Sequence, residues 1–117
     1  MSRRNDEVYL RHMRDAITRV QEYTNSLDAQ AFADSTLVQD AVIRQVQIIG
    51  EASARLSDRF RAEHRDWPWR EMKNMRNILV HEYDAVSVPL VWQVVKRDLP
   101  SVKDHVLRAL TPTLERD

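Results

Sequence analysis

Cysteine is absent from this sequence, glycine is almost absent, and prolines are few. The 117 residues include no cysteine, one glycine and four prolines. The lack of cysteine excludes disulfide bonds, thiolate metal ligands and a cysteine nucleophile, and it suits a reducing cytoplasm. A single glycine excludes a glycine-rich phosphate-binding loop, so any ATP would have to be the ligand of a partner.

Long apolar runs are also missing. No run approaches the roughly 20 residues that cross a bilayer, and the N-terminal MSRRNDEVYL lacks the apolar stretch of a signal peptide. We therefore expect a cytoplasmic protein with no membrane partner.

The sequence also lacks an excess of positive charge. Eighteen basic residues balance eighteen acidic ones, so the strongly basic character of duplex-binding proteins is missing. Between residues 55 and 76, seven basic residues accompany four acidic ones, and seven minus four leaves a local surplus of three. A solvated helix face explains this surplus about as well as a phosphate-binding face does.

What the sequence does contain is helical periodicity in a chain of one-domain length. Its 43% hydrophobic and 31% charged residues are typical of a globular protein, here a single domain over residues 1–117. Apolar residues recur at spacings of three and four, whereas the two-residue alternation of strands is absent. The sequence predicts an all-α fold of four to five antiparallel helices joined by short loops.

Start and stop signals divide this periodicity into helices. The expected ranges are about 5–26, 34–62, 68–83 and 87–98, with a short fifth helix after Pro100. The candidate N-caps are Asn5, Asp6, Asp34, Ser35 and Ser87. Pro68 and Pro89 suit first turns, and Pro100 is expected to end the fourth helix.

Gly50 falls in the middle of the second predicted helix. A glycine there costs about 1 kcal/mol relative to alanine. The close approach of another backbone would compensate for this cost, and that backbone could belong to a neighbouring helix or to a second subunit.

Residues 75–83, MRNILVHEY, place polar side chains around an aliphatic block. At about 100° per residue, Arg76, Asn77 and His81 share one polar arc of the helix. The opposite, apolar arc holds Met72, Met75, Ile78 and Leu79. Tyr83 falls about 20° from Arg76 on the same projection.

The side chains on the polar arc are of the kinds that catalyse reactions at a phosphate. A neutral histidine can take a proton from a hydroxyl near pH 7, an arginine can hold a phosphate through two parallel bonds, and an asparagine can orient either group. These groups suffice to cleave RNA without a metal, by attack of the ribose 2′-hydroxyl on its own phosphate. Geometry alone favours a plainer interpretation. In it, Arg76 pairs with Asp84 or Glu71, while Asn77 serves as a cap and His81 as a hydrogen-bond donor between helices.

The pattern of Arg76, Asn77, three residues, His81, one residue and Tyr83 is similar to the signature of the HEPN superfamily (higher eukaryotes and prokaryotes nucleotide-binding). It resembles in particular the HepT-like toxin branch. The resemblance covers nearly the whole chain. It includes AVIRQVQIIGEASARLS at 41–57, WPWREMKNMRNILVHEY at 67–83 and VWQVVKRDLPSVKDHV at 91–106.

The resemblance implies a HEPN bundle of four to five helices that forms a homodimer, or a higher complex with an antitoxin. It implies an endoribonuclease toxin of a toxin–antitoxin pair, acting on RNA without a metal or a cofactor. By position, Arg76 and His81 would be the catalytic pair and Asn77 a supporting residue. The partner would be a minimal nucleotidyltransferase antitoxin that transfers AMP from ATP to Tyr83. Because Tyr83 falls beside Arg76 on the helix projection, we infer that the anionic adduct blocks the site.

Two alternatives stay open at this point. In the first, the protein is a non-catalytic module in which Arg76 and His81 hold a nucleotide or an RNA end. In the second, it is a dimerisation protein whose motif serves stability alone.

The remaining aromatic residues and histidines are interpreted structurally. The three tryptophans, Trp67, Trp69 and Trp92, could stack on unpaired bases, but packing at helix junctions is favoured. His12, His64 and His105 lie far apart without ligand spacing, so no metal site is expected.

Overall fold

The computed structural model describes residues 3–80 and 87–116, and every regular element in these two ranges is helical. The elements are α1 (Arg3–Thr24), α2 (Ala29–Ala33), α3 (Thr36–Ala54), α4 (Asp58–Glu63), α5 (Trp69–Val80), α6 (Val88–Gln93), the π-helix η2 (Val94–Asp98) and α7 (Leu99–Arg116). The predicted all-α class is confirmed. None of these helices combines the length and apolar character that a bilayer crossing needs.

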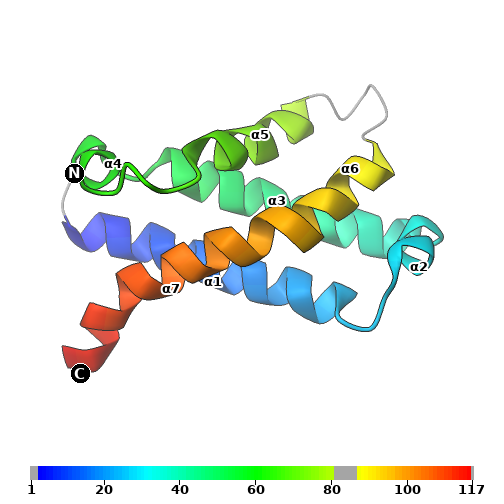
Figure 1. The fold of residues 1–117 in the computed structure, drawn as a ribbon, viewed down its shortest axis with the longest axis horizontal. Coiled ribbons are helices and arrows are strands. Elements are labelled where there is room, and N and C mark those ends of the chain that lie inside the picture. The colour runs from blue at the N-terminus through cyan, green and yellow to red at the C-terminus, as the bar shows by residue number, and fades with distance from the viewer. Residues whose placement is uncertain (1–2, 81–86, 117) are drawn as a thin grey trace.

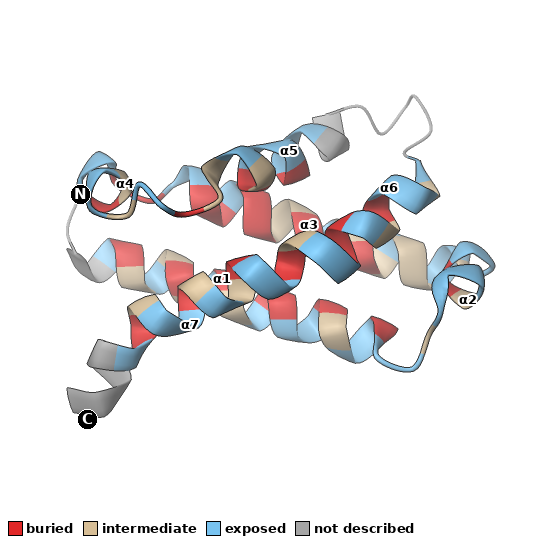
Figure 2. Ribbon diagram, viewed as in Figure 1, coloured by how far each residue is buried: buried red, intermediate tan, exposed pale blue. Residues whose placement is uncertain are grey.

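Helix α3 lies at the centre of the bundle. It packs against α1 on one side and α5 on the other, while α7 packs on α1 (Figure 1). The buried faces of these helices point toward one another (Figure 2). The largest fully buried side chains are Phe32, Met13, Ile17, Ile49, Met72, Met75, Leu99, Leu110, Val20, Val42, Val102 and Val106. A single core therefore joins α1, α3, α5 and α7.

The region predicted as one helix over residues 34–62 is interrupted. Of the two candidate N-caps, Ser35 is the one that caps α3, and its Oγ accepts the Val38 N–H at 3.2 Å. Asp34 is instead the C-cap of α2. Helix α3 ends at Ala54, and α4 begins at Asp58 after the N-cap Ser57. The continuous helix was therefore a wrong prediction. The break lets Leu56 enter the core, where it is 3% exposed.

Asp6 has a different role from the predicted one. Because α1 begins at Arg3, neither Asn5 nor Asp6 caps its start. Asp6 is buried, and its carboxylate accepts the Ser57 N–H at 2.8 Å and the Ser57 Oγ–H at 2.7 Å. Ser57 Oγ in turn accepts the Phe60 N–H at 3.1 Å. Asp6 therefore anchors α1 to the start of α4.

The C-terminal helices follow one another without a break. Ser87 caps α6 as predicted, with Pro89 in the first turn. Pro100 does not end the helix, contrary to prediction, because a π-helical segment precedes it. There the Leu99 N–H bonds the Val94 carbonyl, a wider turn than an α-helix makes. Wider turns of this kind accommodate a proline ring that would otherwise clash with the preceding turn.

The tryptophans fill helix junctions, as predicted. Trp67 is 6% exposed and stacks on half-buried Trp69 with ring centroids 5.6 Å apart. Trp69 Nε1–H donates to the His64 carbonyl at 2.9 Å. Trp92 packs on Phe32 with centroids 5.0 Å apart. These contacts join α4 to α5 and α2 to α6.

Candidate active site on helix α5

Two of the predicted site residues, Arg76 and Asn77, lie in the last two turns of α5. Both are exposed, whereas Met72 and Met75 on the same helix are 1% and 0% exposed. For these four residues, the division of the helix into a polar and an apolar face is confirmed. The apolar face is held by the core, and the polar face is open to solvent.

His81 and Tyr83, the other two predicted site residues, lie outside the described residues, and so does Asp84. The structure therefore brings Arg76 and Asn77 together on one helix. The catalytic role of His81 and the modification of Tyr83 stay predictions.

The guanidinium of Arg76 is unpaired within the described part of the chain. No carboxylate there lies within ion-pair distance of it, and Glu71 in particular does not pair with it. The Asn77 amide likewise makes no hydrogen bond with any described residue. The plainer interpretation is therefore wrong for Glu71 as the partner of Arg76. An exposed arginine without a carboxylate partner is available to bind a phosphate.

The backbone of Arg76 lies against Gly50 of α3. A Cβ placed on Gly50 would lie 3.0 Å from the N, Cα and Cβ atoms of Arg76. Of the two sources proposed for a close backbone, the neighbouring helix is the one observed. The sequence predicted that another backbone lies close to Gly50, but it did not indicate that this backbone is that of Arg76.

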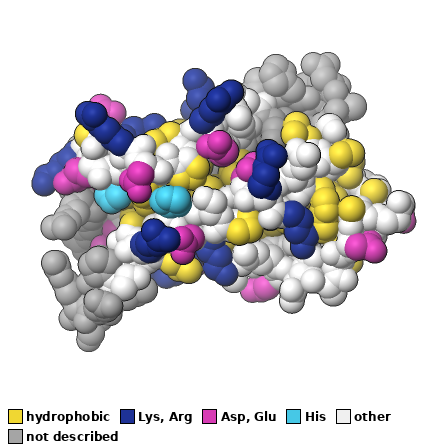
Figure 3. Space-filling view, viewed as in Figure 1, with side chains coloured by type: hydrophobic (Ala, Val, Ile, Leu, Met, Phe, Trp, Pro, Cys, Tyr) yellow, Lys and Arg dark blue, Asp and Glu magenta, His cyan; other side chains and the backbone are white. Residues whose placement is uncertain are grey.

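Other cations lie on α5 and on α4. Arg70 and Lys73 are exposed on α5, and neither forms an ion pair with a described residue. Lys and Arg side chains project along the α4 and α5 edge of the molecule, with acidic side chains among them (Figure 3). Arg61 is half-buried, with its guanidinium carbon 4.7 Å from the centre of a Trp69 ring. The surplus of positive charge is thus local and modest.

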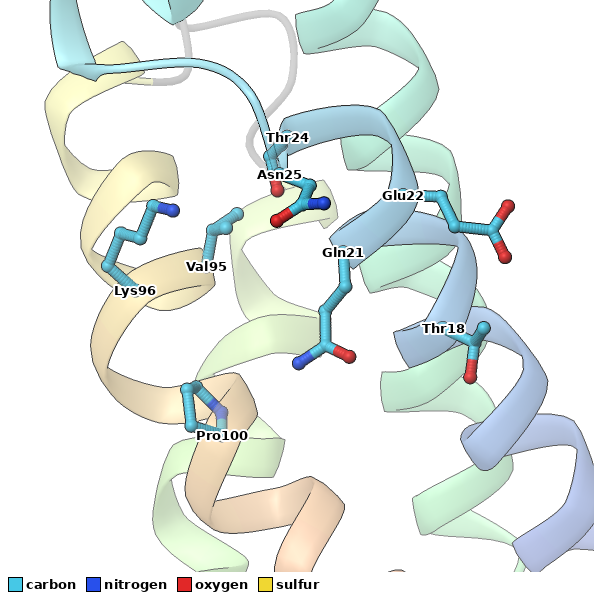
Figure 4. Close-up of a pocket in the computed structure, with 8 residues that line it drawn as sticks. All are labelled: Thr18, Gln21, Glu22, Thr24, Asn25, Val95, Lys96 and Pro100. Carbon is cyan, nitrogen blue, oxygen red and sulfur yellow. The ribbon is translucent and has the colours of Figure 1, made fainter.

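A hollow of about 410 Å³ lies elsewhere, between the end of α1 and the η2 segment (Figure 4). Its lining residues are Thr18, Gln21, Glu22, Thr24, Asn25, Val95, Lys96 and Pro100. None belongs to α5, so this hollow is separate from the Arg76 site. Within residues 3–80 and 87–116, no cluster of histidine and carboxylate side chains is placed to hold a metal ion.

Comparison with known proteins identifies a family for this chain. The family model described as "Ribonuclease HepT-like" matches residues 13–109. A "Gamma-glutamylcyclotransferase and putative RNase" of Methanocaldococcus jannaschii is 39% identical over 108 residues, which is 92% of this chain. This chain spans only about half of that relative, 49% of its length.

Two relatives are matched over nearly their whole length. A "Putative RNase" of Methanocaldococcus jannaschii is 37% identical over 91% of this chain and 97% of its own. A "Probable ribonuclease HepT" of Thermococcus cleftensis is 40% identical over 86% of this chain and 92% of its own. No solved structure is a significant match. This chain belongs to the HepT-like ribonuclease family.

Proposed function

We propose that this protein is a metal-independent endoribonuclease, the toxin of a toxin–antitoxin pair. The observation that carries the proposal is Arg76, an exposed guanidinium with no carboxylate partner in the described part of the chain, in a member of a ribonuclease family. Such a group suits a phosphodiester of single-stranded RNA.

The proposed reaction needs only groups of the motif and the RNA itself. His81 takes the proton of the ribose 2′-hydroxyl, and the 2′-oxygen forms a bond to phosphorus. The bond from phosphorus to the 5′-oxygen breaks, which leaves a 2′,3′-cyclic phosphate and a 5′-hydroxyl that takes up a proton. Arg76 stabilises the negative charge that develops on the phosphate oxygens, and Asn77 orients the phosphate or the histidine.

The test is cleavage of single-stranded RNA in excess EDTA. We expect the parent to cleave and Arg76→Ala or His81→Ala to lose cleavage with no fall in melting temperature. Asn74→Ala, an exposed neighbour on the same helix, is the control and should cleave at the parent rate. Equal cleavage by the parent and both site variants would sink the proposal. RNA binding by a parent that makes no products would instead support the non-catalytic alternative.

Regulation by a partner is a separate part of the proposal. A minimal nucleotidyltransferase antitoxin transfers AMP from ATP to the Tyr83 hydroxyl, releasing pyrophosphate, and the adduct obstructs Arg76. Intact mass after incubation with such an enzyme and ATP should rise in AMP units, and Tyr83→Phe should prevent the rise. An adduct that persists in Tyr83→Phe would place the modification elsewhere.

We also propose that the active form is a homodimer in which two copies of the motif face a shared cleft. Light scattering on the purified protein should give twice the chain mass. A monomer that cleaves RNA at full rate would contradict this assembly.

A further inference from the structure

Gly50 lies at a position where a glycine lowers the stability of a helix. It is buried within α3, fourteen residues after that helix begins at Thr36. A glycine in a helix interior costs about 1 kcal/mol relative to alanine, because it loses more backbone freedom on folding. A neighbouring group that leaves no room for a side chain would explain why this position holds a glycine.

That neighbouring group is the backbone of Arg76. A Cβ on Gly50 would lie 3.0 Å from three Arg76 atoms, two of them backbone atoms. Backbone atoms cannot rotate away as the end of a side chain can, so the two helices would have to separate by a few tenths of an ångström. We propose that Gly50 is a positioning residue, which sets where Arg76 stands and hence where its guanidinium meets the RNA phosphate. This inference rests on the proposed function.

The surroundings of Gly50 favour displacement of Arg76 over loss of the fold. Met72 and Met75 hold the same helix in the core, and both are fully buried. The Gly50 carbonyl also accepts the Ser53 Oγ–H at 2.9 Å, a contact that a Cβ at residue 50 does not remove. A methyl group at Gly50 should therefore shift the base of Arg76 while α5 stays attached to α3.

The experiment is a double-mutant cycle between Gly50→Ala and Arg76→Ala. Cleavage of single-stranded RNA in excess EDTA is one readout. The affinity for a fully 2′-O-methylated RNA, which cannot be cleaved through its 2′-oxygen, is the second readout and does not depend on catalysis. Ala54→Ser, which adds one heavy atom at an exposed position of the same helix, is the matched control.

We expect Gly50→Ala to lower the cleavage rate by up to about tenfold, since a misplacement of about 1 Å in a reacting geometry can cost about 100-fold and this displacement is smaller. Its binding of the methylated RNA should weaken in parallel, while its melting temperature stays near that of the parent. In the Arg76→Ala background, where cleavage is already lost, Gly50→Ala should not weaken binding of the methylated RNA any further, because the group it positions is gone. Ala54→Ser should match the parent.

Three results would overturn the positioning role. They are parent-like cleavage and binding by Gly50→Ala, a loss of binding that recurs in full in the Arg76→Ala background, and a Gly50→Ala protein that does not fold. The last would show that the contact serves the fold as a whole. A parent that binds the methylated RNA but cleaves no RNA would overturn the proposed catalysis alone, and the binding cycle would then decide the role of Gly50. A parent that does neither would overturn both.

Discussion

At the scale of single residues, Met75 and Asn77 lie on the same helix but contribute differently to the free energy of unfolding. Met75 is 0% exposed, so Met75→Ala should leave a cavity and lower the free energy of unfolding by about 2–5 kcal/mol. Asn77 is exposed and unbonded among the described residues, so Asn77→Ala should change it by less than about 0.5 kcal/mol. Urea titration of the two variants checks this contrast. Equal stabilities would mean that α5 is not anchored through Met75.

The residue scale is also where the sequence correctly predicted the buried and exposed faces of α5. The spacing of Met72, Met75, Arg76 and Asn77 is enough to separate buried from exposed side chains, because a helix fixes the direction of each. The role of Gly50 could not be predicted in this way. Its partner is 26 positions further along the chain, and only the packing of α3 on α5 brings the two together.

At the scale of elements, the Asp6 carboxylate joins α1 to α4. Asp6→Ala removes two hydrogen bonds and leaves the buried Ser57 N–H and hydroxyl without this acceptor. We expect the free energy of unfolding to fall by about 1–3 kcal/mol. Asp15→Ala, which removes an exposed carboxylate of the same helix, is the control and should cost less than about 0.5 kcal/mol. Chemical denaturation measures both. Equal losses of unfolding free energy in the two variants would mean that the contact between Asp6 and Ser57 does not stabilise the protein.

Two prolines in the C-terminal helices make a matched pair. Pro100 lies in a helix interior and cannot donate a backbone hydrogen bond, so Pro100→Ala should stabilise the protein by about 1–2 kcal/mol. This is less than the full proline penalty, because the π-helical turn before it already relieves part of the clash. Pro89→Ala should have almost no effect, since a first-turn N–H has no helical partner. Thermal unfolding compares them, and equal shifts would contradict this account.

Element boundaries were predicted well where the signal is local and poorly where it is tertiary. Ser35 and Ser87 cap their helices through their own hydroxyl groups, and both were among the N-caps that the sequence predicted, Ser35 with Asp34 as the alternative. The break after Ala54 carries no glycine or proline. It depends on Leu56 entering the core and on Asp6, 51 residues away, binding Ser57. Pro100 misled the prediction because the π-helical turn before it accommodates the ring, and buried Leu99 and Val102 hold the helix in the core on both sides of it.

At the scale of the whole molecule, zero net charge makes RNA affinity depend on a local set of cations. Arg70, Lys73 and Arg76 are exposed on α5 and unpaired among the described residues. Three phosphate contacts to a single strand predict that log affinity falls with log salt at a slope of about −2. Lys73→Ala should reduce this slope by about 0.7. Arg108→Ala, whose cation is paired with Asp104 on α7, should leave it unchanged.

Fluorescence anisotropy of a labelled single-stranded RNA, titrated at several salt concentrations, gives these slopes. The same slope for Lys73→Ala and Arg108→Ala would show that α5 is not the surface that RNA contacts.

The contact between Gly50 and Arg76 also has a consequence for motion. Side chains that separate two helices can change rotamer, and the distance between the helix axes changes with them. Here the contact includes two backbone atoms of Arg76 on one side and no side chain on the other, so no rotamer change at Gly50 alters the spacing. The main chain of Arg76 is therefore held at a fixed distance from α3, although its side chain is exposed. The guanidinium can therefore reach only the positions that the rotamers of Arg76 allow from one fixed point on α5.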